Sequence, residues 1–184
     1  MQSIPPKNLK TKVANLKLIR YNLSALAETM AYLGLAIAVP FIFAHTPQNQ
    51  WITGTLVNTI LIIACVRTGL INAAFIAAVP SVIALLRGLL PLPMAAALPY
   101  IIISNILMIM IFSRLFQRNR VFAVISASFA KFLFLFSISS LLIADKLPQK
   151  FAYMLSLPQL ITALAGGLLA MLLLNIWKKQ SPAQ

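Results

Sequence analysis

Residues able to perform acid–base, nucleophilic or metal chemistry are scarce and widely separated in this sequence. Glu28 and Asp145 are the two acidic residues, His45 is the single histidine and Cys65 is the single cysteine. Hydrolases and transferases need paired carboxylates, a histidine-bound metal or an activated nucleophile, and the sequence offers no such pair. It therefore predicts a protein that is not an enzyme and that has neither a metal site nor a cofactor.

Lys131 is the residue that most clearly needs an interaction partner, because it lies inside an apolar run at 121–144. It is about ten residues, or roughly 15 Å of helix, from the inner end of that run. An ammonium group at such a depth in hydrocarbon needs a partner or water, or else it loses its proton. Neither Glu28 nor Asp145 is well placed to be that partner. Three interpretations stay open: an anionic ligand, hydrogen bonds to Asn105 and backbone carbonyls, or a side chain that snorkels to the surface.

Uncharged polar residues inside the apolar runs gather in the middle and in the half of each run that we expect to face outward. This asymmetry predicts a polar pocket that opens outward and binds a small molecule, with Arg87 as a second, more exposed contact for an anion. The alternative is that these side chains only form hydrogen bonds between helices, each contributing about 0.6 kcal/mol. The candidate substrate-binding residues are Asn58, Arg87, Tyr100, Asn105, Lys131, Gln159 and Thr162.

The composition places these residues in a membrane protein. The 184-residue chain is 61% hydrophobic and 9% charged, whereas soluble domains carry roughly 25% charged residues. The apolar residues form long runs, which is the pattern required of membrane-spanning helices. The formal net charge of +13 does not indicate nucleic-acid binding, because the basic residues lie at the ends of apolar runs, where they meet lipid headgroups.

The apolar runs predict an all-α fold, a polytopic membrane helix bundle with six transmembrane helices. Residues 1–22 are a basic N-terminal segment, either a disordered tail or a short helix on the inner leaflet. Residues 23–179 form one membrane domain and 180–184 a C-terminal tail. Polar or Pro-rich connections are expected at 45–50, 89–94 and 145–150. We predict the spans at 23–44, 52–66, 70–86, 95–116, 121–144 and 151–177.

The distribution of lysine and arginine predicts that both ends of the chain lie in the cytoplasm, since positive residues favour that side of the membrane. With six spans, eleven basic residues fall on cytoplasmic segments and three, Arg87, Lys146 and Lys150, on outer segments. Five spans would place the basic C-terminus outside. The eleven are Lys7, Lys10, Lys12, Lys17, Arg20, Arg67, Arg114, Arg118, Arg120, Lys178 and Lys179.

Small residues spaced four apart mark faces on which another helix can approach closely. Packing within the chain is the default interpretation for two such sets, one in the first span and one in the last. Glu28, in the first span, is expected to pair with an arginine or lysine on the cytoplasmic side or to face a partner chain. The small pairs are Ala27/Ala31, Gly34/Ala38, Ala163/Gly167 and Gly166/Ala170.

The stretch from 54 to 112 has a characteristic order of polar residues, glycines and prolines. Asn lies early in the second span, Gly after it, Pro late in the third, then a Gly-Leu-Leu-Pro loop, and finally Pro and Asn in the fourth. In this sequence these are Asn58, Gly69, Pro80, 88–91, Pro99 and Asn105. This order resembles that of the substrate-binding S components of bacterial energy-coupling-factor (ECF) vitamin transporters. The Ala27/Ala31 pair is similar to the Ala-x-x-x-Ala contact by which such subunits dock on a shared coupling protein.

The resemblance implies a subunit of the bacterial cell membrane that captures a micronutrient from outside. It would deliver this substrate by toppling within a complex of one transmembrane coupling subunit and two ATPase subunits. The N-terminal His motif of metal-transporting members is missing, and the scarcity of acidic residues argues against a strongly cationic substrate. A neutral or anionic small molecule is therefore expected.

Two alternatives to this function stay open. The first is a non-transport scaffold of the cell envelope, in which the polar residues serve only helix packing. The second is a self-sufficient small transporter or channel. The shortage of polar residues in the inner halves of the predicted spans disfavours the second alternative, because such a protein needs a continuous polar path or a carboxylate for a coupling ion.

Overall fold

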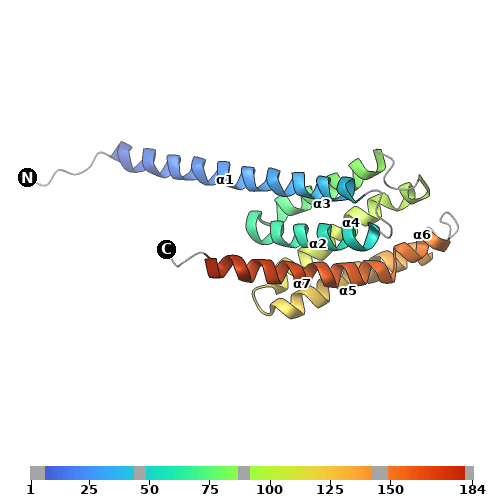
Figure 1. The fold of residues 1–184 in the computed structure, drawn as a ribbon. Coiled ribbons are helices and arrows are strands. Elements are labelled where there is room, and N and C mark those ends of the chain that lie inside the picture. The colour runs from blue at the N-terminus through green and yellow to red at the C-terminus, as the bar shows by residue number, and fades with distance from the viewer. Residues whose placement is uncertain (1–6, 44–48, 87–91, 142–148, 181–184) are drawn as a thin grey trace, which may run out of the picture.

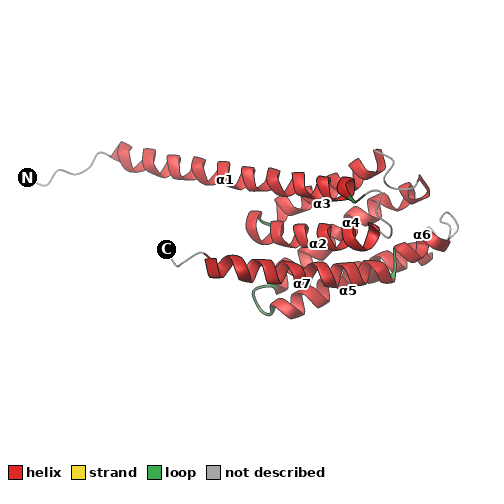
Figure 2. Ribbon diagram, in the orientation of Figure 1, coloured by secondary structure: helices red, strands yellow, loops and turns green. Residues whose placement is uncertain are grey.

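The computed structural model describes residues 7–43, 49–86, 92–141 and 149–180, and these ranges are helical apart from short turns (Figure 2). No strand occurs among them, so the all-α prediction is confirmed for the described residues. The elements are α1 (Lys7–Ile42), α2 (Asn49–Thr68), α3 (Leu70–Leu86), a 3₁₀ helix η1 (Leu92–Ala97), α4 (Leu98–Leu115), α5 (Arg120–Leu141), α6 (Gln149–Met154) and α7 (Leu157–Gln180).

Five segments of the described chain are long and apolar enough to cross a membrane. They support the predicted membrane protein, while α3, whose apolar part covers Leu70–Ile83, is shorter than the other five. The five are Leu23–Ile42, Gln50–Thr68, Ala95–Leu115, Arg120–Leu141 and Ala152–Trp177.

The helices lie nearly parallel or antiparallel in one bundle, and the first turn of α1 lies at the same end as the last turn of α7 (Figure 1). We call this the proximal end and the opposite one the distal end. At the proximal end, Gly69 joins α2 to α3 with φ +90°, a backbone conformation that glycine adopts without strain. The second proximal turn precedes α5, where the Asn119 side chain caps the helix by accepting a hydrogen bond from Phe122 N at 3.0 Å.

The expected start of the first span, at residue 23, agrees with the apolar segment Leu23–Ile42, but the helix that contains this segment, α1, begins earlier. It runs without interruption over 36 residues from Lys7, with Pro40 as the only proline inside it. A helix of that length measures about 54 Å, whereas the hydrocarbon core of a bilayer is about 30 Å thick. The N-terminal part of α1 therefore extends beyond the other helices at the proximal end (Figure 1), as a continuation of the first apolar segment.

The run predicted as one span at 151–177 is divided in two. The short helix α6 ends at Met154, and Leu155 and Ser156 form a tight turn in which Ser156 N donates to Tyr153 O at 3.0 Å. Pro158 follows at the start of α7. Because proline lacks an amide hydrogen and restricts the residue before it, a helix breaks before Pro158 but begins easily around it.

The predicted connections also differ in detail from the described helices. Asn49 and Gln50 were expected in a loop but belong to α2, where the Gln50 side chain donates to Met154 O at 2.7 Å. The second half of the expected Pro-rich connection at 89–94 belongs to η1, and the first half lies within 87–91, outside the described residues. The same holds for 44–48 and 142–148.

The packing between α7 and its neighbours depends on the small residues that the sequence singled out. A Cβ atom built on Gly166 would lie 2.6 Å from Thr55 O and 2.8 Å from Asn58 Cβ on α2. On the adjacent position, a Cβ on Gly167 would lie 2.4 Å from Val124 Cγ1 on α5. Internal packing is therefore confirmed for the last span.

The small residues of α1 behave differently. Ala27 and Ala31 are exposed, and a Cβ atom on Gly34 would meet nothing within 4 Å. Internal packing, the default interpretation for this set, is therefore wrong for these three residues. Their face of α1 points away from the bundle, toward the surroundings that lipid fills in a membrane.

We predict that Gly166→Ala destabilises the folded protein, whereas Gly34→Ala does not. The added methyl at Gly166 meets backbone atoms of α2 that cannot move aside, and overpacking of this kind costs about 1–3 kcal/mol. At Gly34 the methyl finds open space and raises helix propensity. Thermal unfolding of the two purified variants in detergent measures the difference, and equal unfolding temperatures would contradict the close α2–α7 packing.

Candidate functional site

Four buried polar residues lie in the middle of the bundle, and we refer to Asn58, Asn105, Ser128 and Lys131 as the polar layer. They belong to α2, α4 and α5, and each retains at most 5% of its exposed area. Polar side chains in hydrocarbon are costly and are retained where they bind one another, a ligand or an ion. The polar layer is therefore the candidate functional site of the described chain.

The four residues share one depth in the bundle. Asn58 and Asn105 each lie ten residues before the proximal ends of their helices, Thr68 and Leu115, and Lys131 lies eleven residues after Arg120, where α5 begins. Ten residues correspond to about 15 Å, which is half the hydrocarbon thickness. Ser128 precedes Lys131 by three positions and is buried like it, so both lie on the inward face of α5.

Lys131 donates a hydrogen bond to Asn58. The distance between Lys131 Nζ and Asn58 Oδ1 is 2.8 Å, and both side chains are buried. This contact joins α5 to α2 at mid-depth. The interpretation that Lys131 contacts Asn105 is not what the structure shows, because α2, and not α4, presents the accepting amide. Snorkelling is also excluded, since Lys131 remains only 3% exposed.

The position of Asn58 is fixed by α7. The absence of a side chain at Gly166 leaves room for the Cβ of Asn58, and one residue along α2 the Thr59 hydroxyl donates to Gly166 O at 3.0 Å. Helices that approach this closely hold a side chain in one orientation. The amide that accepts from Lys131 is thus positioned by a neighbouring backbone and not by its own helix alone.

Three polar atoms of the polar layer are buried without a hydrogen-bond partner among the described residues: Asn58 Nδ2, Asn105 Oδ1 and Ser128 Oγ. Buried groups of this kind cost about 1–3 kcal/mol each when they stay unpaired, and most such groups in folded proteins are paired. Among the described residues the layer therefore has an unused amide donor on Asn58, an unused hydroxyl on Ser128 that can donate or accept, and an unused amide acceptor on Asn105.

The described chain provides no carboxylate for Lys131. Glu28 lies near the proximal end, where its two oxygens accept from Arg67 Nη2 at 2.9 Å and Arg67 Nε at 3.2 Å. The expected pairing of Glu28 with an arginine on that side is confirmed. The same guanidinium lies 6.0 Å from the ring centroid of Trp177, so Arg67 links α1, α2 and α7. Asp145 lies outside the described residues.

The other candidate residues do not join the polar layer. Tyr100 packs in a small apolar cluster around Ala97, Leu135 and Leu155 on the distal side. The Gln159 side chain donates to Met154 O at 3.3 Å. Thr162 is buried and donates to Pro158 O of its own helix at 2.8 Å. Arg87 lies outside the described residues.

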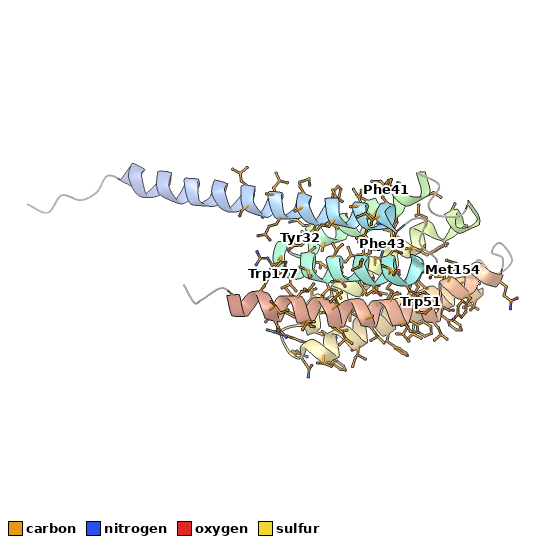
Figure 3. The ribbon with its side chains drawn as sticks, viewed as in Figure 1. Tyr32, Phe41, Phe43, Trp51, Met154 and Trp177 are labelled. Carbon is orange, nitrogen blue, oxygen red and sulfur yellow. The ribbon has the colours of Figure 1, made fainter. Side chains whose placement is uncertain are left out.

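Two features were missed by the sequence analysis. One is Ser128, whose position three residues before Lys131 was the available signal. The other is an open cavity of about 440 Å³ between the distal end of α5, α6 and the turn that follows α6. Figure 3 shows Met154, at the end of α6, on this distal side together with Trp51, whereas Trp177 lies toward the proximal end. The cavity is lined by Phe136, Ser139, Ser140, Gln149, Ala152, Tyr153 and Ser156.

Two further observations concern metals and relatives. Within the described ranges, no three His, Cys, Asp or Glu residues come close enough together to hold a metal ion. No protein-family model matches the chain, and neither a curated protein nor a solved structure gives a significant match.

We predict that a double-mutant cycle detects coupling between Lys131 and Asn58. Asn58→Ala removes the accepting oxygen and leaves a buried ammonium unpartnered, which is strongly destabilising. Lys131→Met removes the charge and keeps an apolar chain of similar length, so it costs less than Asn58→Ala or stabilises. In the double variant Asn58→Ala loses about 1 kcal/mol or more of its effect. Unfolding free energies of the four proteins measure this, and strictly additive values would refute the contact.

Proposed function

We propose that this protein is the membrane-embedded substrate-capture subunit of an ECF-type importer in a bacterial cell membrane. It binds a small neutral or anionic molecule from the outer side and relies on partner ATPases for energy. The observation that carries this proposal is the polar layer, in which a buried lysine bound to Asn58 and three polar atoms without a hydrogen-bond partner among the described residues lie near mid-depth. A bundle that needed polar groups only for packing would pair them with one another.

The distribution of apolar packing supports entry from the distal side. The larger apolar cluster lies mostly between the polar layer and the proximal end, and its fully buried members include Met108, Ile109, Phe112 and Ala123. The distal half has a smaller cluster around Leu135 and Leu155, and beyond it lies the 440 Å³ cavity. A protein that captures a molecule and keeps it from passing through needs such a closed proximal half.

The proposed topology has six spans with both ends in the cytoplasm, so that the proximal end is the inner one. Six crossings follow if α3 also spans, and its 17 residues measure about 25 Å, which a locally thinned bilayer accommodates. Arg67, Arg114, Arg118 and Arg120 then fall on the cytoplasmic side, as the preference of basic residues requires.

The exposed small face of α1 supports docking on a transmembrane coupling subunit. Ala27 and Ala31 do not serve packing within the chain, and small residues let a partner helix approach closely in lipid. The helix is also the least buried of the five long apolar ones. In this proposal the coupling subunit and its two ATPases supply the energy.

A second candidate function, a non-transport scaffold, is favoured by one observation. The hydrogen bond from Lys131 to Asn58 joins α5 to α2. In a scaffold, holding these two helices together would be the only role of the two residues. The unpartnered Asn105 Oδ1 and Ser128 Oγ have no role in that reading. The capture function therefore gives a role to more residues of the polar layer than the scaffold function does.

Native mass spectrometry of the gently purified protein tests capture directly. We expect a retained small molecule at one-to-one stoichiometry, and its loss in Lys131→Met, since that variant removes the charged donor. The matched control is Arg118→Ala, which removes an exposed basic residue far from the layer and should keep the ligand. A protein that carries no small molecule and co-purifies with envelope-assembly proteins would overturn the transport proposal in favour of the scaffold.

Bulky substitution on α1 tests the docking surface. Ala27→Leu combined with Ala31→Leu should leave the unfolding temperature unchanged, because both positions are exposed, but should abolish co-purification of a coupling subunit by blocking close approach. Ser137→Leu places a similar side chain on an exposed position of α5 and should leave the complex intact. Undiminished recovery of the complex with the α1 variant would remove this face from the proposal.

A further inference from the structure

The polar layer has a specific pattern of unused hydrogen-bonding groups. An ammonium has three hydrogens, and Lys131 directs one of them to Asn58 Oδ1. Asn58 Nδ2 and Ser128 Oγ are two further donors, whereas Asn105 Oδ1 is an acceptor, and all three atoms are unpartnered among the described residues. The layer thus contains several groups that can donate, on Lys131, Asn58 and Ser128, and one acceptor, on Asn105 of α4.

When Lys131 is protonated, its charge is also uncompensated within the described chain. Glu28, the one carboxylate in the described ranges, is engaged with Arg67 near the proximal end. A buried charge without an opposite charge costs several kcal/mol, and hydrogen bonds from an ammonium to an oxyanion are about twice as strong as those between neutral groups. An anionic group at the layer would therefore satisfy both the charge and the donors.

We infer that the polar layer binds the carboxylate of its ligand, and that this ligand has a hydroxyl or N–H group next to the carboxylate. This inference rests on the proposed capture function and specifies its substrate class. The carboxylate accepts from Lys131, Asn58 Nδ2 and Ser128 Oγ, and the adjacent hydroxyl or N–H donates to Asn105 Oδ1. No covalent step is involved.

The number of charges favours a carboxylate over a phosphate. The layer has one cation, Lys131, whereas a phosphate monoester carries about −1.5 to −2 at neutral pH and would remain largely uncompensated in hydrocarbon. A halide would satisfy the charge but leave Asn105 Oδ1 without a donor. The remainder of the ligand meets apolar surface, because Leu135 follows Lys131 by one turn on the same buried face of α5 and belongs to the distal apolar cluster.

Small carboxylates and their uncharged analogues test this inference on the purified, ligand-free protein. The probes are sodium acetate, which has only the carboxylate, sodium glycolate, which adds a hydroxyl, and acetamide, which has the same shape as acetate without the charge. We expect the unfolding temperature to rise with acetate, to rise further with glycolate, and to stay unchanged with acetamide, at constant ionic strength. Binding to the folded state alone produces such a rise.

Three variants locate the effect. Lys131→Met should weaken acetate binding by about tenfold or more, because it removes a charge-assisted donor. Asn58→Asp keeps the shape of the side chain but places a carboxylate beside Lys131. It should therefore raise the unfolding temperature of the ligand-free protein and abolish the response to acetate and glycolate, since the internal anion takes the place of the ligand. Asn105→Ala should remove the advantage of glycolate over acetate.

Each contrary result overturns the inference. An equal response to acetamide, to chloride or in Lys131→Met would show that the layer does not recognise a carboxylate. The absence of any response to acetate and glycolate would do the same. The capture function is tested separately, because a metabolite retained in native mass spectra supports it even if that metabolite is uncharged.

Discussion

The cost of holding one ammonium group in the middle of an apolar bundle organises this protein. Lys131 is buried at a depth where water is excluded, so every neighbour that can accept from it or neutralise it gains importance. Asn58 accepts one hydrogen bond, and its orientation depends on the closeness of α7 to α2, which Gly166 permits. The hydrogen bond between Lys131 and Asn58 therefore depends on the close packing of α7 against α2.

Opposite ends of the bundle use different interactions. Near the proximal end, charged and aromatic side chains of α1, α2 and α7 meet at Arg67, and apolar side chains fill the space above them. Toward the distal end the chain breaks between α6 and α7, and the Met154 carbonyl at this break accepts from both Gln50 and Gln159. The side-chain amides thus satisfy a carbonyl that the interrupted helix leaves free.

The sequence was sufficient to predict the long apolar helices and the position of Lys131 deep within one of them. Long apolar runs and a lone charged residue within one are strong signals. It could not predict the partner of Lys131. In lipid both the inward and the outward faces of a helix are apolar, so periodicity does not reveal which residues face one another. The continuity of α1 with the basic N-terminal segment was not predicted, since the length of an apolar run does not mark where the helix that contains it starts.

The length of α1 has a mechanical consequence. Its basic N-terminal part and its membrane part form a single helix, so the two cannot reorient independently. The 16 residues from Lys7 to Asn22 form an arm of about 24 Å beyond the apolar segment. A change in tilt as large as the average tilt of membrane helices, about 20°, would swing the tip of this arm sideways by about 8 Å. Small rotations of α1 are in this way converted into a larger displacement of its N-terminal end.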